Sequence, residues 1–218
     1  MLRSLLKIRL IDIQKTRNVF SNRFSLNDHH LLKTIDQFVR NENIKLEETE
    51  LFKYHNEFKP INQTYALGLQ DQCQCSLEVF CNPWGYSNLS SKSKNVLHSQ
   101  FCGPSSYDLI ETEFKKIINL YISIKVKGFN YSSRNGVLGG YYLHSLKKQK
   151  VFIVTQGNHR ISVLKYLGYN YVPIYTMIGH LEHVHESKSN TWSEVAKGKC
   201  SHSDALTIFR CYFRNYDC

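Results

Sequence analysis

The sequence lacks several features that would assign it to a class at once. Its 218 residues contain no uninterrupted apolar run near the ~20 residues that a transmembrane helix needs, so we expect no membrane span. The first ten residues are interrupted by charge at Arg3, Lys7 and Arg9, and no small-residue cleavage site follows, so we expect no secretory signal. The seven cysteines are an odd number in a chain with room for an ample core, and a disulfide framework is not required. We therefore expect a cytoplasmic protein.

Acidic residues are also scarce, because 18 Asp and Glu stand against 28 Lys and Arg, giving a net charge of +10. Residues 1–40 and 101–150 each carry eight basic and three acidic residues. This excess permits nucleic-acid binding, but a composition rich in Lys, Asn, Ile and Tyr explains most of it, and net charge by itself bears on solubility and non-specific binding. With 42% apolar and 13% aromatic residues, the chain is not of the disordered class.

Four cysteines fall close together, at Cys73, Cys75, Cys81 and Cys102, with His98 nearby. Zinc sites usually draw thiolates from CxxC-type pairs, and this spacing matches no such pattern. We assign no metal to these cysteines and leave their role open. The surrounding residues 70–103 are rich in Ser, Asn, Gln and Cys without periodicity, which indicates a long irregular segment and a candidate functional loop.

Helical periodicity predicts four helices outside residues 151–168. An amphipathic helix over 25–40 has an N-terminal signal at its start, and a short helix over 61–68 follows Pro60 and ends at a glycine. A longer helix begins near residue 105 and ends at Gly128. A last helix is predicted over 203–212, and we expect it to pack in the core. In the first helix the apolar residues that recur at helical spacing are Leu31, Leu32, Ile35, Phe38 and Val39. The buried face expected of the longer helix is Ile110, Phe114, Ile117, Ile118, Tyr121 and Ile124.

Strand patterns follow the long helix. Residues 137–143 and 151–155 predict two strands joined by a turn over 145–150. Gly139 and Gly140 inside the first strand indicate a bulge or the close approach of another backbone. Residues 171–175 predict a further strand, and the proline at 173 favours an edge strand or a strand end.

The most informative segment is residues 151–168, where a fully apolar strand stops at Gly157 and a short helix opens at Asn158. A helix N-terminus after a glycine turn is suited to anions, because unpaired N–H groups and the positive end of the helix dipole point outward. Asn158 can cap, while His159 and Arg160 add donors, and a guanidinium suits phosphate because it donates two parallel bonds. The alternative interpretation is structural: Asn158 is a plain N-cap, His159 a surface histidine and Arg160 a salt-bridge partner.

Taken together, these residues resemble the ParB/sulfiredoxin superfamily. Members share an "SI…G" helix end, a glycine-then-basic phosphate box and an "LG…IPV" strand. The corresponding residues here are Ser123–Gly128, Gly157–Arg160 and Leu167–Ile174. The similarity covers roughly residues 104–178, and the flanks resemble a bacterial subfamily of ParB-like proteins encoded beside polysaccharide-biosynthesis genes.

The resemblance implies an α/β (α+β) fold, a compact mixed sheet with packed helices, in which Gly157, Asn158, His159 and Arg160 bind a nucleotide. We divide the chain into an N-terminal helical flank (1–69), an irregular segment (70–103), the nucleotide-binding core (104–178) and a C-terminal helical flank (179–218). Asn158 stands where sulfiredoxin has its reactive cysteine, so that chemistry is not expected. The roughly 40 residues after Met177 are too few for the DNA-binding half of a partition protein.

The expected function is therefore nucleotide binding, as a phosphotransferase or nucleotide hydrolase on a small metabolite or a sugar-related acceptor. ATP, ADP or CTP is the expected nucleotide, with His159 as phosphate ligand or acid/base. If Mg²⁺ takes part it needs a carboxylate, for which Glu111 and Glu113 are the candidates that the family topology implies. For both, a solvated acidic first turn is the structural alternative. Two other functions stay open: a ParB-like DNA-associated regulator, and a non-catalytic interaction protein that retains the fold.

Overall fold

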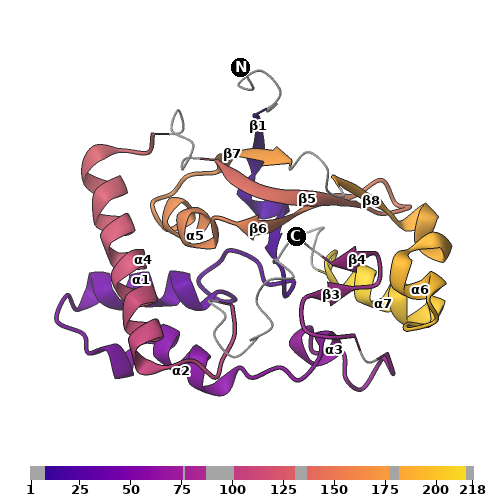
Figure 1. The fold of residues 1–218 in the computed structure, drawn as a ribbon. Helices are drawn as coiled ribbons and strands as arrows, with labels where there is room; N and C mark the ends of the chain where they lie inside the picture. Colours follow the sequence, from indigo (N-terminus) through magenta and orange to yellow (C-terminus); the bar gives the residue numbers. More distant parts are fainter. Residues whose placement is uncertain (1–7, 76, 87–100, 131–136, 177–181, 215–218) are drawn as a thin grey trace, which may run out of the picture.

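The computed structural model describes residues 8–75, 77–86, 101–130, 137–176 and 182–214, and its centre is a six-stranded mixed sheet (Figure 1). The strand order is β1-β7-β5-β6-β2, and β8 pairs with β5 off this path. The strands are β1 (Arg9–Asp12), β2 (Thr16–Asn18), β5 (Leu138–His144), β6 (Lys150–Gln156), β7 (Tyr171–Thr176) and β8 (His183–His185), and a separate small sheet pairs β3 (Cys81–Asn82) with β4 (Gly85–Tyr86). The α-helices are α1 (His30–Arg40), α2 (Glu50–Glu57), α3 (Gln63–Ala66), α4 (Tyr107–Lys127), α5 (Asn158–Tyr166), α6 (Ser193–Ala196) and α7 (His202–Cys211). The expected mixed α/β class is confirmed.

Both faces of the central sheet are buried. Phe152 and Val154 of β6 belong to one apolar cluster with α1, α4 and α5, whereas Val151 and Ile153 belong to a second cluster with α7 and residues 66–84. Figure 1 shows α4 and α5 on one side of the molecule and the α6–α7 region on the other. A strand covered on both faces needs apolar residues at successive positions, which explains the uninterrupted apolar run of β6.

The long helix agrees with its predicted signals. Ser106 caps α4 by accepting the N–H of Leu109, and Gly128 ends it with φ +74°, a left-handed conformation that glycine adopts without strain. Five of the six residues expected on its apolar face are buried, and Phe114 is partly buried against the same core. Helix α1 begins later than predicted, at His30 instead of residue 25.

One expectation about the strands is confirmed and another is wrong. The register between β5 and β6 shifts between Gly139 and Gly140, and a Cβ on Gly140 would lie 1.9 Å from the carbonyl oxygen of Ile153, so the predicted bulge and close approach are both present. The expectation that Pro173 marks an edge or a strand end was wrong. Strand β7 is internal, because β1 pairs with it on one side and β5 on the other, and Pro173 stands opposite Leu10 inside that ladder.

The two flanks are not purely helical, contrary to expectation. Strands β1 and β2 bring residues 9–18 into the central sheet, and β8 adds residues 183–185. Their three or four residues are too short for a period-two pattern to be visible in the sequence. The sheet is therefore completed by segments outside the 104–178 core.

The described part of residues 70–103 is more ordered than an irregular loop. It forms β3 and β4 and buries Trp84, which contacts the aromatic rings of Trp192, Phe209 and Tyr212. Residues 76 and 87–100, including His98, lie outside the described residues. The last helix packs in the core as expected, through Ala205, Ile208 and Phe209.

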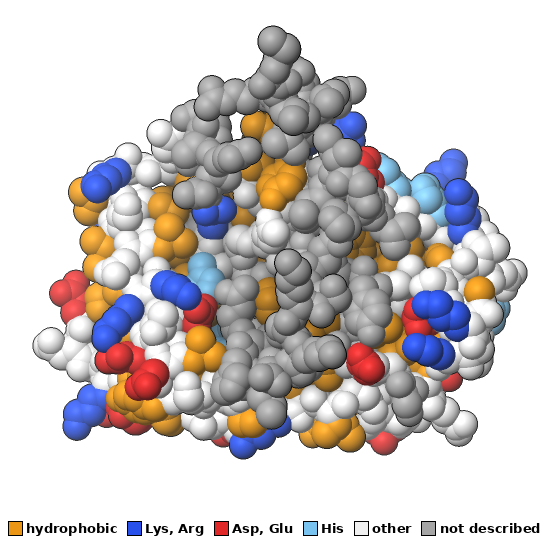
Figure 2. Space-filling view, viewed as in Figure 1, with side chains coloured by type: hydrophobic (Ala, Val, Ile, Leu, Met, Phe, Trp, Pro, Cys, Tyr) orange, Lys and Arg blue, Asp and Glu red, His pale blue; other side chains and the backbone are white. Residues whose placement is uncertain are grey.

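Two surface properties bear on the open functional alternatives. None of the described helices combines the length and the apolar character that crossing a bilayer requires. On the face shown in Figure 2, Lys and Arg side chains lie among Asp and Glu side chains at both sides of the molecule. On this face, therefore, basic and acidic side chains are intermixed at both sides.

Candidate functional site

The glycine turn between β6 and α5 has the conformation that the sequence predicts. Strand β6 ends at Gln156, Gly157 takes φ +95°, and α5 begins at Asn158. A Cβ on Gly157 would lie 2.5 Å from Cδ2 of Leu138, so both the backbone angle and the available space require glycine. This turn fixes the direction in which the first residues of α5 point.

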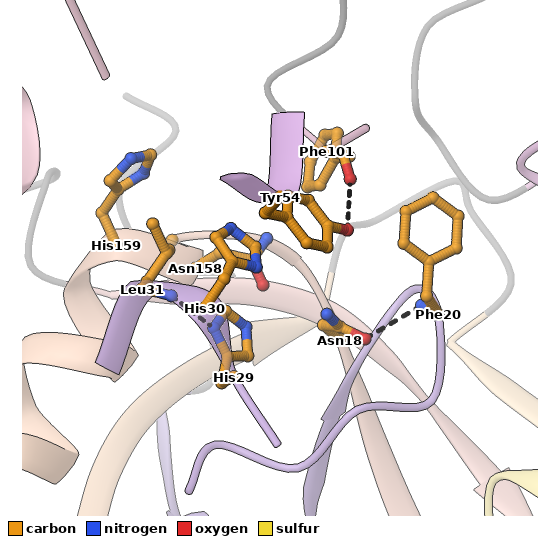
Figure 3. Close-up of a pocket in the computed structure, with 10 residues that line it drawn as sticks. Asn18, Phe20, His29, His30, Leu31, Tyr54, Phe101, Asn158 and His159 are labelled. Atoms are coloured by element: carbon orange, nitrogen blue, oxygen red, sulfur yellow. Dashed lines mark hydrogen bonds between the residues drawn. The ribbon is translucent and has the colours of Figure 1, made fainter. Parts of the chain in front are cut away.

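A cavity of about 50 Å³ lies at the N-terminus of α5. Its wall joins α5 to the start of α1, to α2 and to the turn after β2, and Figure 3 shows the side chains gathered around it. The lining residues are Asn18, Phe20, His29, His30, Leu31, Tyr54, Phe101, Gly157, Asn158 and His159. This volume holds a group of the size of a few water molecules and excludes a whole nucleoside.

His159 contacts a buried carboxylate on α4. Its Nε2 lies 3.0 Å from Oε2 of Glu113, whose side chain is only 3% exposed, and Nζ of Lys116 lies 2.6 Å from Oε1 of the same carboxylate. Burial raises the pKa of Glu113, but the contacts with His159 and Lys116 outweigh it and hold that pKa at about 2. Glu113 is therefore a carboxylate at neutral pH, placed to orient the imidazole and to stabilise its protonated form.

The structure distinguishes Glu111 from Glu113 as the candidate carboxylate, a choice that the sequence left open. Glu113 faces the core and meets His159, whereas Glu111 lies on the outer side of α4 and pairs with Lys115 at 2.8 Å. Two positions along a helix rotate a side chain to a different face, which is the physical reason. Only Glu113 belongs to the candidate site.

Two adjacent histidines at the start of α1 form the opposite wall of the cavity. His29 is the N-cap, and its Nδ1 accepts the N–H of Leu31 at 3.3 Å, while its buried Nε2 has no hydrogen-bond partner. Burial, reinforced by the charge of His159 and opposed by Asp28, lowers the pKa of His29 to about 3. His29 is therefore neutral in the folded protein at physiological pH.

His30 stacks on Tyr54 of α2, with ring centroids 3.7 Å apart and planes within 10°. Burial, together with the neighbouring histidines, lowers the pKa of His30 well below its usual value. Tyr54 is held in place by donating its hydroxyl to the carbonyl of Phe101 at 2.7 Å. The cavity wall is thus a set of packed, neutral aromatic rings.

A third histidine, His55, lies behind this wall on α2. Its Nδ1 is 2.9 Å from Oγ of Ser105, and its ring meets that of His30 edge to face. Burial lowers the pKa of His55, Glu113 opposes that shift and His159 adds to it. The rings of His30, Tyr54 and His55 therefore form one packed cluster beside the cavity.

Two residues of the predicted phosphate box are placed differently from expectation. Asn158 is the first helical residue and makes no capping bond, since the cap position is taken by Gly157; its Oδ1 is buried at the cavity without a hydrogen-bond partner. Arg160 is not among the residues that line the cavity. Its Nη1 lies 3.5 Å from the carbonyl of Val137, toward β5, and burial lowers its pKa.

The sequence did not assign His29, His30, His55 or Tyr54 to the site. The two adjacent histidines at 29 and 30 were the one sequence feature that could have indicated a site, but within an amphipathic pattern such residues are typical of a helix surface. These residues reach α5 only through tertiary packing, because α1 and α5 are in contact although more than a hundred residues separate them.

The metal sites considered from the sequence do not fit the described residues. No group of three or more His, Cys, Asp or Glu side chains in the described ranges is arranged to hold a metal ion. One oxygen of Glu113 faces Lys116 and the other faces His159, and Glu111 is on the surface. Cys73, Cys75 and Cys81 are free thiols, and they are buried together with Cys102 in the apolar core. We therefore derive no chemistry through a Mg²⁺ held by these carboxylates.

Comparison of the chain with protein-family models, with curated proteins and with solved structures finds no match. The function of the chain is therefore inferred from the geometry of this site.

Proposed function

We propose that the chain is a nucleotide-binding phosphotransferase or nucleotide hydrolase, which acts on a small metabolite or a sugar-related acceptor and in which His159 is the acid/base. One observation carries the proposal: the imidazole of His159 lines a small cavity at the N-terminus of α5, with Nε2 3.0 Å from the buried carboxylate of Glu113. A histidine oriented by a carboxylate is a standard general base.

The phosphate end of the substrate is expected at the N-terminus of α5. The first turn of a helix leaves its N–H groups without helical acceptors, and the helix dipole favours an anion there. The cavity of about 50 Å³ accommodates a phosphate-sized group, so the sugar and base of ATP, ADP or CTP would lie outside it. Arg160 is directed toward Val137 and has no part in this proposal.

The proposed reaction is a proton-coupled displacement at phosphorus. A hydroxyl, from water or from the acceptor, attacks the terminal phosphoryl group, a new O–P bond forms, and the bond to the leaving phosphate breaks. Neutral His159 accepts the proton of the attacking hydroxyl, and the leaving phosphate takes the electron pair of the broken bond. The carboxylate of Glu113 stabilises the imidazolium that results. The neutral rings of His29 and His30 add no competing charge to the cavity wall.

The cellular setting in this proposal is the cytoplasm. Five cysteines of the described residues, Cys73, Cys75, Cys81, Cys200 and Cys211, are free and buried, which suits a reducing compartment.

The test is a thermal-shift screen of ATP, ADP, CTP and GTP, each with and without Mg²⁺, on the full chain. A ligand at a hundred times its Kd stabilises the folded state by about 2.7 kcal/mol, which raises the Tm by several degrees. The decisive variant is Asn158→Asp, because a carboxylate there favours the helix dipole but repels a phosphate. Asn119→Asp on the exposed side of α4 is the matched control.

We expect a nucleotide to raise the Tm of the wild type and of Asn119→Asp but not of Asn158→Asp. If no nucleotide raises the Tm, the enzyme proposal is wrong and a non-catalytic interaction protein is favoured. If Asn158→Asp binds as well as the control, the nucleotide site is elsewhere. With a nucleotide identified, phosphate release by His159→Gln should fall by about 10²-fold or more, the usual contribution of a general base.

A further inference from the structure

Three histidines lie together at one end of the central sheet, where β8 pairs with the last residues of β5 (Figure 1). The two strands are parallel, and their register places His144 opposite His185 and Tyr142 opposite His183. Residues two apart on a strand point to the same face of a sheet, and so do residues that stand opposite each other. His144, His183 and His185 therefore project from the same face.

Two of these imidazoles have ring nitrogens in direct contact. Nε2 of His144 lies 2.8 Å from Nδ1 of His183, and when both rings are neutral one nitrogen donates its proton to the other. The two nitrogens are therefore directed at one shared point. A metal ion at that point needs a lone pair on each nitrogen, and the donor ring provides one when its proton moves to its other nitrogen.

Neighbouring rings hold the two imidazoles in place. The ring of His144 stacks on that of His185, with centroids 4.5 Å apart and planes within 17°. The ring of His183 stacks on that of Tyr142, with centroids 5.5 Å apart and planes within 8°. Side chains whose rotation is restricted by packing lose less freedom when they bind a ligand. The pair is therefore preorganised.

Both imidazoles are neutral at physiological pH. Burial, reinforced by His185 and Lys150, lowers the pKa of His144 to about 4. Burial and Lys150 also lower the pKa of His183, and Glu182 opposes that shift. Lys150 and Glu182 carry opposite charges, and both act on the pair. Because metal ions bind the neutral form of imidazole, the two rings are in the protonation state that ligation requires.

The spacing of the two nitrogens fits a metal ion that binds its ligands at right angles. With metal–nitrogen bonds of about 2.0 Å, two nitrogens at right angles about the ion lie about 2.8 Å apart, whereas tetrahedral ligands lie about 3.3 Å apart. The observed separation of 2.8 Å matches the first arrangement. Square-planar or tetragonal coordination by nitrogen is typical of Cu²⁺ and Ni²⁺, whereas Zn²⁺ prefers the tetrahedral arrangement.

We propose that His144 and His183 form a binding site for a divalent transition-metal ion of tetragonal geometry, Cu²⁺ or Ni²⁺. Among the described residues no further His, Cys, Asp or Glu side chain is arranged to add a third ligand, so water or a small ligand would take the remaining positions. His183 is exposed, which gives the ion access. The site shares no residue with the cavity at α5, and the proposal does not depend on the proposed function.

The experiment titrates Cu²⁺, Ni²⁺ and Zn²⁺ into the full chain by isothermal titration calorimetry and records electron paramagnetic resonance spectra of the copper samples. The test variants are His183→Gln, at an exposed position that the fold should tolerate, and His144→Gln. His202→Gln is the matched control, since Nε2 of this histidine lies 2.9 Å from Oγ of Ser189. Losing a ligand should weaken binding at least as much as losing an outer-shell partner, about 10- to 100-fold.

We expect the wild type and His202→Gln to bind Cu²⁺ or Ni²⁺, with a tetragonal copper spectrum that shows coupling to imidazole nitrogens. Each test variant should lose the tight binding and that spectrum. The proposal is overturned if neither Cu²⁺ nor Ni²⁺ binds to the wild type, or if both test variants bind like His202→Gln, because the ion is then held by other histidines. Tighter binding of Zn²⁺ than of Cu²⁺ and Ni²⁺ would also overturn it, since it indicates a tetrahedral site.

Discussion

Replacing Glu113 by glutamine tests the central contact of the candidate site. The wild-type carboxyl has a pKa of about 2 in the folded protein against a usual 4.5. Each unit of pKa difference corresponds to about 1.4 kcal/mol, so ionised Glu113 stabilises the folded state by about 3 kcal/mol at most. A depressed carboxyl pKa contributes this stability above pH 4.5, and the contribution is lost as the pH falls toward 2. Glu113→Gln removes it at every pH.

The assay is urea denaturation of the wild type and of Glu113→Gln over a series of pH values. We expect the difference in unfolding free energy to be largest at neutral pH and to shrink by up to about 3 kcal/mol as the pH falls through the range from 4.5 to 2. Glu111→Gln is the control, because its ion pair with Lys115 is exposed and such pairs contribute about 0–1 kcal/mol. A difference below about 0.5 kcal/mol at neutral pH, or one that does not change with pH, would refute the reasoning.

Three further predictions concern the glycine turn before α5, the histidine that caps α1 and a buried tyrosine after α7. Gly157→Ala should destabilise the protein by about 1–3 kcal/mol, because it forces both a left-handed alanine and a 2.5 Å contact with Leu138. Gly168→Ala is the control and should destabilise less, since that glycine has φ +85° but lies in open space. Equal urea denaturation midpoints for the two variants would contradict this prediction. His29 has a pKa of about 3 in the folded protein instead of 6.5, so the unfolded chain binds more protons between these pH values. The stability of the wild type should therefore fall as the pH drops below 6.5. His29→Asn, which retains a capping oxygen, should show a weaker fall when its Tm is measured as a function of pH. Tyr212→Phe should lower stability by about 1–2 kcal/mol, because the buried carbonyl of Val19 loses the hydroxyl that it accepts at 2.8 Å, and an unchanged denaturation midpoint would argue against that bond.

Local signals in the sequence were sufficient for the elements around the candidate site. The polar residues before α4 and the glycine after it mark its ends, because a helix terminus is closed by the side chains and backbone angles of adjacent residues. Gly157 marked the turn into α5 for the same reason, and the Gly139–Gly140 pair marked the bulge in β5. Each of these features is decided within a few residues of the chain.

Interactions between distant segments could not be predicted in this way. Strands β1 and β2 are too short to carry a pattern, and their pairing with β7 and β6 depends on segments more than a hundred residues away. The internal position of Pro173 follows from that pairing. The choice between Glu111 and Glu113 likewise required knowing which face of α4 meets α5.

The sequence by itself therefore determined the α/β class, the long helix, the apolar strand and the glycine that aims α5. The tertiary structure alone decided what stands opposite that helix: the carboxylate of Glu113 and the neutral histidines at the start of α1. The physical reason is that caps and turns are short-range interactions, whereas burial and ion pairing depend on which faces meet when the chain packs.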